Sequence, residues 1–209
     1  MSLWNKKNKE TLLAPLGKSN PVLVQMLGVC SALAVTVKLE PSLVMALAVT
    51  VVVAFANVII SLLRKTIPGR IRIIVQLVVV ATLVTLVSEV LKAFAYDVSK
   101  QLSVFIGLII TNCILMGRLE AFALGNGPWE SFLDGIGNGL GYGIVLVAVG
   151  FFRELFGTGQ LLGLQIIPQG FYELGYVNNG LMILPPMSLI LVAVLIWIQR
   201  SRTPELQEK

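Results

Sequence analysis

Six long stretches of the chain are continuously apolar, and each contains a wide window without charged side chains. Each approaches the roughly 17 to 25 residues that an α-helix needs to cross a bilayer core of about 30 Å. The stretches do not alternate between apolar and polar positions, which argues against the strands of a membrane barrel. The pattern predicts an all-α integral membrane protein with six transmembrane helices, at approximately residues 20–38, 41–63, 71–94, 101–119, 135–156 and 181–200.

The composition fits a membrane protein. Hydrophobic residues make up 56% of the 209 residues and charged residues 13%, a surplus that a soluble core cannot explain. The remaining segments are too short for a Rossmann unit, so we expect a single membrane domain over residues 1–209, without an NADH or flavin site of its own. The first helix is expected to be retained, because no small-residue cleavage site follows a short apolar core.

Basic side chains gather on one side of the expected bundle. Twelve of the sixteen Lys and Arg residues flank that side, namely Lys6, Lys7, Lys9, Lys18, Arg64, Lys65, Arg70, Arg72, Arg118, Arg200, Arg202 and Lys209. Because cytoplasmic loops are enriched in Lys and Arg, the N- and C-termini are predicted to be cytoplasmic. The formal net charge of +5 reflects this bias. No nucleic-acid partner is expected, since no basic groove with interleaved aromatic residues occurs.

The six helices divide into two sets of three that enter the bilayer from opposite faces, which is an inverted 3+3 repeat. The first helix of each set carries one of the two cysteines, Cys30 and Cys113, at nearly the same position. In straight helices the two cysteines would differ in depth by about 8 Å. Gly28 and Ser31 beside Cys30, and Asn112 beside Cys113, offer places for a break. We expect each of these helices to be interrupted near its cysteine.

The cysteines have three possible interpretations. In the first, they are buried free thiols that act as small hydrophobic groups. In the second, they form a disulfide, which would be unusual at the bilayer centre. In the third, they are metal ligands. Two thiolates cannot complete a four-cysteine iron–sulfur or zinc site, so a partner chain or a second copy would supply the others. The chain has no histidine, which excludes His-bound haem, a Ser-His-Asp triad and a His-based proton relay within it.

Two acidic residues are candidates for an ion path, because an ionisable group within a span is a functional hypothesis by default. Glu89 is expected toward the outer end of the third helix, and Asp134 at the start of the fifth helix on the cytoplasmic side. Each also has a structural interpretation. Glu89 can pair with Lys92 at i, i+3, and Asp134 can cap the helix that follows it.

Alternate glycines mark the run DGIGNGLGYG at residues 134–143. A nucleotide-binding loop is not expected, because no strand precedes the run and a membrane helix follows it. Glycines spaced by four, such as Gly135, Gly139 and Gly143, instead provide a flat face for close helix contact.

Several segments together resemble the Nqr/Rnf family of membrane subunits, and within it the D type that belongs to sodium-translocating NADH:quinone oxidoreductases. They are LGVCSALAVT (27–36), IRIIVQ (71–76), YDVSKQLSVFIGLIITNCILMGRLEAFA (96–123), DGIGNGLGYG (134–143) and GFFRELFGTG (150–159). The resemblance extends from about residue 20 to 200. Within the family, an Rnf-type ferredoxin:NAD oxidoreductase subunit fits less well. The alternative from another functional class is a transporter or channel component without a redox role.

The resemblance implies a multi-pass subunit of the bacterial cell inner membrane that pairs with the E-type subunit in inverted orientation, in a complex with the A, B, C and F subunits. It implies that Cys30 and Cys113, with two cysteines of the E-type subunit, hold an intramembrane [2Fe-2S] cluster. Electrons from NADH would pass toward a flavin of the C-type subunit, and sodium export would accompany quinone reduction. NADH, FAD, FMN, riboflavin and quinone would bind only to other subunits. Glu89 and Asp134 match places where such families are proposed to use acids for sodium.

Overall fold

The computed structural model describes residues 6–17, 19–94, 106–161, 164–165 and 180–202. Its elements are α1 (Lys6–Leu13), η1 (Ala14–Leu16), α2 (Val29–Val35), α3 (Leu39–Leu63), α4 (Arg72–Phe94), α6 (Ile106–Ile110), α7 (Cys113–Arg118), η2 (Leu119–Ala123), α8 (Pro128–Thr158), β1 (Gln160–Leu161), β2 (Leu164–Gln165), η3 (Gly180–Ile183) and α10 (Pro185–Arg202). The segment η2 is one π-helical turn that continues α7. Apart from the two-residue pairing of β1 with β2, the described regular structure is helical, which confirms the predicted class.

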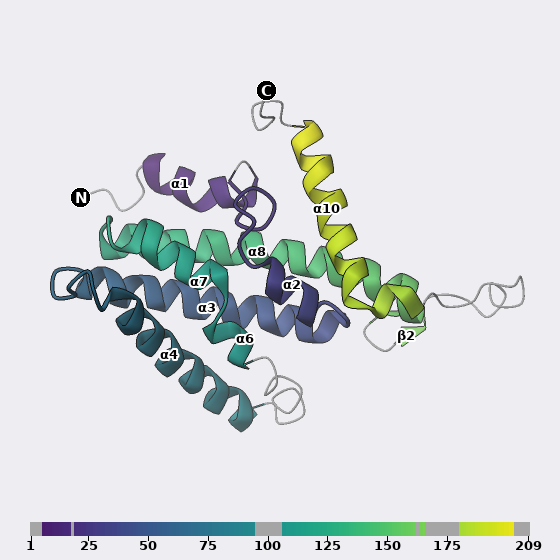
Figure 1. Ribbon diagram of the computed structural model, residues 1–209, viewed down its shortest axis with the longest axis horizontal. Helices are drawn as coiled ribbons and strands as arrows, with labels where there is room; N and C mark the ends of the chain where they lie inside the picture. The colour runs from purple at the N-terminus through teal and green to yellow at the C-terminus, as the bar shows by residue number, and fades with distance from the viewer. Residues whose placement is uncertain (1–5, 18, 95–105, 162–163, 166–179, 203–209) are drawn as a thin grey trace, which may run out of the picture.

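Three of the described helices, α3, α4 and α8, are long and apolar enough to cross a membrane. Figure 1 shows α3 and α8 side by side along the longest axis, with α1 against the N-terminal part of α8 and α4 diverging from the pair. The helix predicted at 101–119 has its first five residues outside the described ranges, and its remainder is divided between α6 and α7. The described residues therefore do not display six continuous spans.

The helix predicted at 20–38, with an interruption near its cysteine, is represented by α2. Met26 has φ 55° and Gly28 has φ 83°, and neither value is compatible with a right-handed helix. The second break lies between α6 and α7, where Asn112 is extended with φ −68° and ψ 124°. Each cysteine therefore lies within two residues of an interruption of the helical backbone, as the sequence led us to expect.

The start of the fifth predicted helix is corrected by the structure. The helix α8 begins at Pro128 rather than near residue 135. Gly127 is extended, and a proline fits the first helical position because its missing N–H would have no partner within the helix there. Asp134 consequently lies inside α8, so the interpretation that it caps this helix is wrong.

The alternating glycines bring α8 into backbone contact with two different elements. A Cβ atom added at Gly139 would lie 2.6 Å from the Cα atom of Thr50, and one at Gly135 would lie 2.6 Å from the Cα atom of Ala54, both on α3. On another face of α8, a Cβ atom at Gly141 would lie 2.6 Å from the carbonyl oxygen of Pro15 in η1. The prediction that this run serves helix packing is confirmed.

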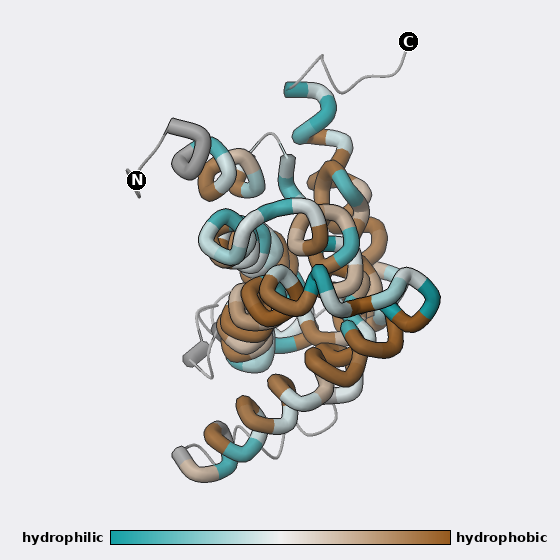
Figure 2. The backbone as a smooth tube through the Cα atoms, turned by 90° about the vertical axis from the view of Figure 1, so that its left-hand side faces the viewer, coloured by the Kyte–Doolittle hydropathy of each residue, from teal (hydrophilic) through white to brown (hydrophobic). Residues whose placement is uncertain are grey.

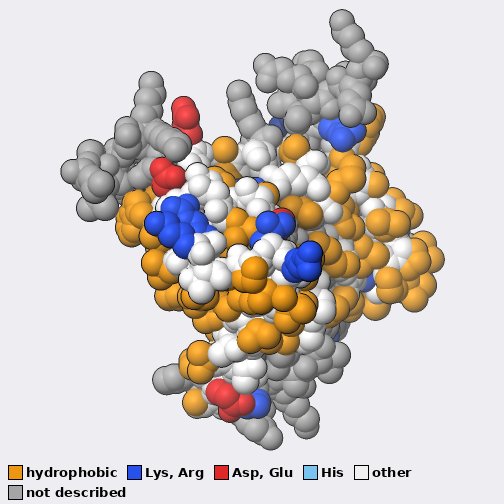
Figure 3. Space-filling model, turned by 60° about the vertical axis from the view of Figure 1, so that its left-hand side comes forward, with side chains coloured by type: hydrophobic (Ala, Val, Ile, Leu, Met, Phe, Trp, Pro, Cys, Tyr) orange, Lys and Arg blue, Asp and Glu red, His pale blue; other side chains and the backbone are white. Residues whose placement is uncertain are grey.

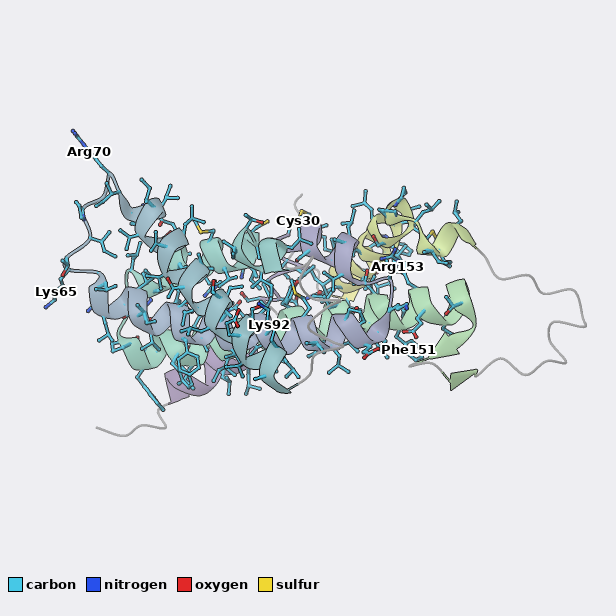
Figure 4. All side chains as sticks on the ribbon, turned by 90° about the horizontal axis from the view of Figure 1, so that it is seen from below. Cys30, Lys65, Arg70, Lys92, Phe151 and Arg153 are labelled. Atoms are coloured by element: carbon cyan, nitrogen blue, oxygen red, sulfur yellow. The ribbon has the colours of Figure 1, made fainter. Side chains whose placement is uncertain are left out.

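The outer surface is mostly apolar between polar ends. Figure 2 shows hydrophobic residues along the diverging helix α4, and Figure 3 shows hydrophobic side chains over much of the face it displays. Lys65 and Arg70, in the connection between α3 and α4, lie at one end of the long axis in Figure 4, while Arg153 and Phe151 lie toward the other. This distribution is suited to a bilayer, in which lipid or neighbouring helices cover the apolar middle.

We expect Gly139→Ala to destabilise the protein by about 1 to 3 kcal/mol, because the new methyl group forces α3 and α8 apart. Thermal unfolding of the purified complex in detergent measures the loss. Gly107→Ala, on α6, is the matched control, since an added Cβ atom there meets nothing within 4 Å. Equal melting temperatures for the Gly139 variant and the control would contradict the close contact.

Candidate functional site

The two cysteines lie together although 83 positions separate them in the chain. Their Sγ atoms are 3.3 Å apart, and both residues are exposed on the surface of the chain. This distance is longer than the roughly 2.05 Å of a disulfide bond, so both thiols are free. The two backbone breaks have removed the depth difference of about 8 Å that straight helices would impose.

Each cysteine occupies the first turn of a short helix, because the break before it starts that helix. Cys113 is the first residue of α7, and the side chain of Asn112 caps the helix by accepting a hydrogen bond from the backbone N–H of Ile114 at 3.3 Å. Cys30 follows Gly28, the left-handed residue from which α2 starts. Both sulfurs therefore lie beside the first turn of a short helix.

Tyr142 of α8 lies directly behind the cysteine pair, and sequence reasoning missed it. Its side chain is fully buried, and its hydroxyl is 2.7 Å from the Ser31 hydroxyl and accepts a hydrogen bond from the Asn112 amide at 3.4 Å. Ser31 follows Cys30 and Asn112 precedes Cys113, so one side chain joins the two cysteine-bearing segments. The available signal was a tyrosine among the alternating glycines of residues 134–143.

The short helices α2 and α7 run away from the cysteine pair in opposite directions along α8. At the end of α2, Arg153 of α8 donates hydrogen bonds to the Leu33 carbonyl at 3.3 Å and to the Thr36 hydroxyl at 2.6 Å. At the end of α7, Arg118 forms an ion pair with Asp134 of α8. Tyr142 lies between these two points of α8, and Figure 1 shows the same divergence.

The cysteine pair has the spacing of two ligands of one metal. Two sulfur ligands of one tetrahedral metal, with bonds of about 2.3 Å, lie about 3.8 Å apart, which is close to the 3.3 Å between the cysteine sulfurs. The described residues contain no group of three or more His, Cys, Asp or Glu side chains that could hold a metal ion. The pair therefore fits half of a four-ligand site. Its exposure leaves the other half open to a second chain.

Asp134 is buried in an ion pair rather than at a helix end. Its carboxylate binds the Arg118 guanidinium through both oxygens and accepts a hydrogen bond from the Asn138 amide at 2.9 Å. The amide oxygen of Asn138 is buried and has no hydrogen-bond partner. These three residues line a cavity of about 290 Å³ that Glu10 and Ser19 also border. The cavity thus brings the Asp134 carboxylate and the unpartnered Asn138 oxygen together, with the Arg118 guanidinium beside them.

Glu89 lies elsewhere and has its own partner. Its carboxylate accepts a hydrogen bond from Lys92 at 2.7 Å, and both side chains are exposed on the part of α4 that diverges from the bundle. The pairing that the sequence suggested at i, i+3 is thus present. The structure does not bring Glu89 next to Asp134 or the cysteines.

Arg153 is a second functional candidate that the sequence did not single out. It is 1% exposed, and besides its bonds to the end of α2 it donates to the carbonyls of Met182 at 3.0 Å and Ile183 at 2.7 Å. The adjacent Glu154 accepts a hydrogen bond from the backbone N–H of Leu39, at the start of α3, at 2.6 Å. The sequence contained a signal for Arg153, because Arg153 and Glu154 are adjacent charged residues within an apolar stretch.

Comparison with known proteins gives a consistent family. A family model described as "Rnf-Nqr subunit, membrane protein" matches residues 8–196. Proteins from Shewanella sp. (strain W3-18-1) and Shewanella putrefaciens are each 56% identical over 200 residues, covering 96% of this chain and 95% of theirs. A protein from Shewanella baltica is similar to the same extent. All three are named as the D subunit of a Na(+)-translocating NADH-quinone reductase.

We expect Arg118→Gln to destabilise the protein by about 3 to 5 kcal/mol, because it leaves the Asp134 carboxylate buried without its ion-pair partner. The control is Arg72→Gln, which removes the Arg72–Glu120 ion pair, whose side chains are 40% and 42% exposed. An exposed pair of this kind contributes about 0 to 1 kcal/mol. Thermal unfolding of both variants measures the difference, and equal losses would count against a structural role for the buried pair.

Proposed function

The chain belongs to the Rnf-Nqr family of membrane subunits, and we propose that it is the D subunit of a sodium-translocating NADH–quinone reductase in a bacterial inner membrane. In this role it relays electrons across the membrane, and sodium export accompanies quinone reduction. The observation that carries the proposal is the pair of exposed thiols 3.3 Å apart, in an apolar helical protein whose described residues contain no group of three or more His, Cys, Asp or Glu that could hold a metal ion.

We propose that Cys30 and Cys113 supply two of the four ligands of a [2Fe-2S] cluster. The remaining ligands come from the E-type subunit, which presents two cysteines in the same way from the opposite orientation. When bound, such a cluster supplies one-electron transfer. The chain's own contribution is to hold two sulfurs together at its surface, at the starts of two helices. NADH, FAD, FMN, riboflavin and quinone bind to other subunits of the A to F complex.

We further propose that the chain is an inverted 3+3 repeat with both termini in the cytoplasm. The opposite directions of α2 and α7 along α8 support the inversion, because the first helices of two inverted halves approach the midplane from opposite faces. Cys30 lies between the two ends of the long axis in Figure 4. The end that carries Lys65 and Arg70 is then the cytoplasmic one, in agreement with the enrichment of basic residues in cytoplasmic loops.

A sodium path is the second part of the proposal, with Asp134 and Glu89 as its candidates. Asp134 is supported by the cavity that it lines with Asn138, whose amide oxygen has no partner. A sodium ion that entered there would compete with the Arg118 guanidinium for the carboxylate. Glu89 is supported only by its position on a membrane helix.

Cys30→Ala and Cys113→Ala are each expected to remove the iron and acid-labile sulfide that this subunit shares, because each removes one of the four cysteine ligands of the proposed cluster. Metal analysis and the EPR spectrum of the purified complex measure this. Thr111→Ala, which changes the residue before Asn112 and leaves both thiols in place, is the control. Full iron and sulfide content in both cysteine variants would refute the cluster.

Asp134→Asn and Glu89→Gln are expected to raise the sodium concentration for half-maximal stimulation by about tenfold, as for a lost charged ligand worth roughly 1.4 kcal/mol. The iron content should remain unchanged. Quinone reductase activity of the complex, measured against sodium concentration, tests this. Glu130→Gln removes the same charge from the first turn of α8 and serves as the control. An unchanged sodium dependence would take the altered residue out of the path.

A further inference from the structure

The polar groups behind the two cysteines form a hydrogen-bond chain with a defined direction. Ser31 donates its only hydroxyl proton to the Gly28 carbonyl at 2.9 Å. The 2.7 Å contact between Ser31 and Tyr142 must therefore have the tyrosine as its donor. The amide oxygen of Asn112 accepts from Ile114, which fixes the orientation of that amide, so its nitrogen donates to Tyr142. The chain runs from Asn112 through Tyr142 and Ser31 to Gly28.

We propose that Tyr142 is a positioning residue, whose hydroxyl ties the two cysteine-bearing segments to one point of α8 and so sets the spacing of the Cys30 and Cys113 sulfurs. The spacing of the sulfurs is a property of this chain alone. Its consequence for a bound group, a change in the redox potential, rests on the proposed cluster function.

The burial of the chain of hydrogen bonds makes it a strong constraint. Asn112 and Tyr142 are 0% exposed and Ser31 is 1% exposed, so no water competes for these groups. An unpaired polar group in such surroundings is costly. The breaks beside the cysteines can therefore shift only if all of these hydrogen bonds shift together.

The ring of Tyr142 adds a steric limit to the hydrogen bonds. A Cβ atom at Gly28 would lie 3.0 Å from Cε2 of Tyr142, and Gly28 has φ 83°, which strains any other residue. The backbone before Cys30 is thus pressed against the ring, while the Ser31 hydroxyl after Cys30 is bonded to its oxygen. Cys30 is held from both sides, and Cys113 is held through Asn112. Groups arranged in this way behind metal ligands commonly tune the bound centre.

The test uses Tyr142→Phe in the complete complex, since this variant keeps the ring and removes only the hydroxyl. The first measurement needs no metal: complex from iron-starved cells is oxidised with diamide, which takes two electrons and two protons from the thiols. The Cys30–Cys113 disulfide is then quantified by differential alkylation and mass spectrometry. We expect the disulfide to form roughly fivefold more slowly, the factor that one neutral hydrogen bond is worth. The second measurement is the EPR spectrum and midpoint potential of the iron-loaded complex, in which we expect a shift at unchanged iron content.

Ser31→Ala should reproduce both the slower disulfide formation and the shifted midpoint potential. Ser31→Thr, which keeps a hydroxyl, should behave like the wild type in both measurements. The double variant Ser31→Ala/Tyr142→Phe should exceed neither single variant, because both break the same chain. Ser188→Ala removes a buried hydroxyl on α10 that bonds only locally, to Pro185, and is the control.

Wild-type disulfide rates in Tyr142→Phe and Ser31→Ala would overturn the proposal. If Tyr142→Phe fails to assemble, the Ser31 variants decide. If Cys30→Ala and Cys113→Ala keep their iron, the proposed cluster is refuted. The disulfide rate still tests whether Tyr142 sets the spacing of the two sulfurs.

Discussion

Backbone groups inside a bilayer must find their partners within the protein, and this constraint governs how the two cysteines can meet. A straight membrane helix satisfies its own N–H and carbonyl groups, whereas a broken helix leaves several of them free. At the break before Cys113, the Asn112 side chain accepts the N–H of Ile114. At the break before Cys30, the Gly28 carbonyl accepts both the backbone N–H of Ala32 and the Ser31 hydroxyl. Tyr142 then joins these two side chains. The polar residues that permit the breaks are the same ones that hold the sulfurs together.

The helix α8 provides the common frame for both broken helices because its glycines allow close approach on two faces. Gly139 permits the backbone contact with α3, and Gly141 permits the contact with η1. Along its length, α8 also binds the end of α7 through Asp134, the two breaks through Tyr142, and the end of α2 through Arg153. The spacing of Asp134, Tyr142 and Arg153 along one helix fixes where α2 and α7 begin and end. A single straight helix thus compensates for the irregular backbone of two others.

Much of this arrangement could be predicted from the sequence, and the limits have physical causes. Apolar windows located the long helices, and the depth mismatch between Cys30 and Cys113 required breaks, which glycine and short polar residues made possible. Charge-free windows could not show that α8 begins at Pro128, because the first turns of α8 contain Glu130 and Asp134 and are still helical. The role of Tyr142 was not predictable, because it depends on the tertiary contact of three segments distant in sequence.

The exposure of the thiols and the divergence of α4 lead to the same conclusion about assembly. Burying a pair of thiolates within one chain would require further ligands from that chain, and the described residues offer none beside the pair. The helix α4 leaves an apolar groove against α3, lined by residues such as Val51 and Val90, which lipid or another helix must cover. Both surfaces are thus open to another chain, the cysteine pair as half of a four-ligand site and the α3–α4 groove as an apolar face.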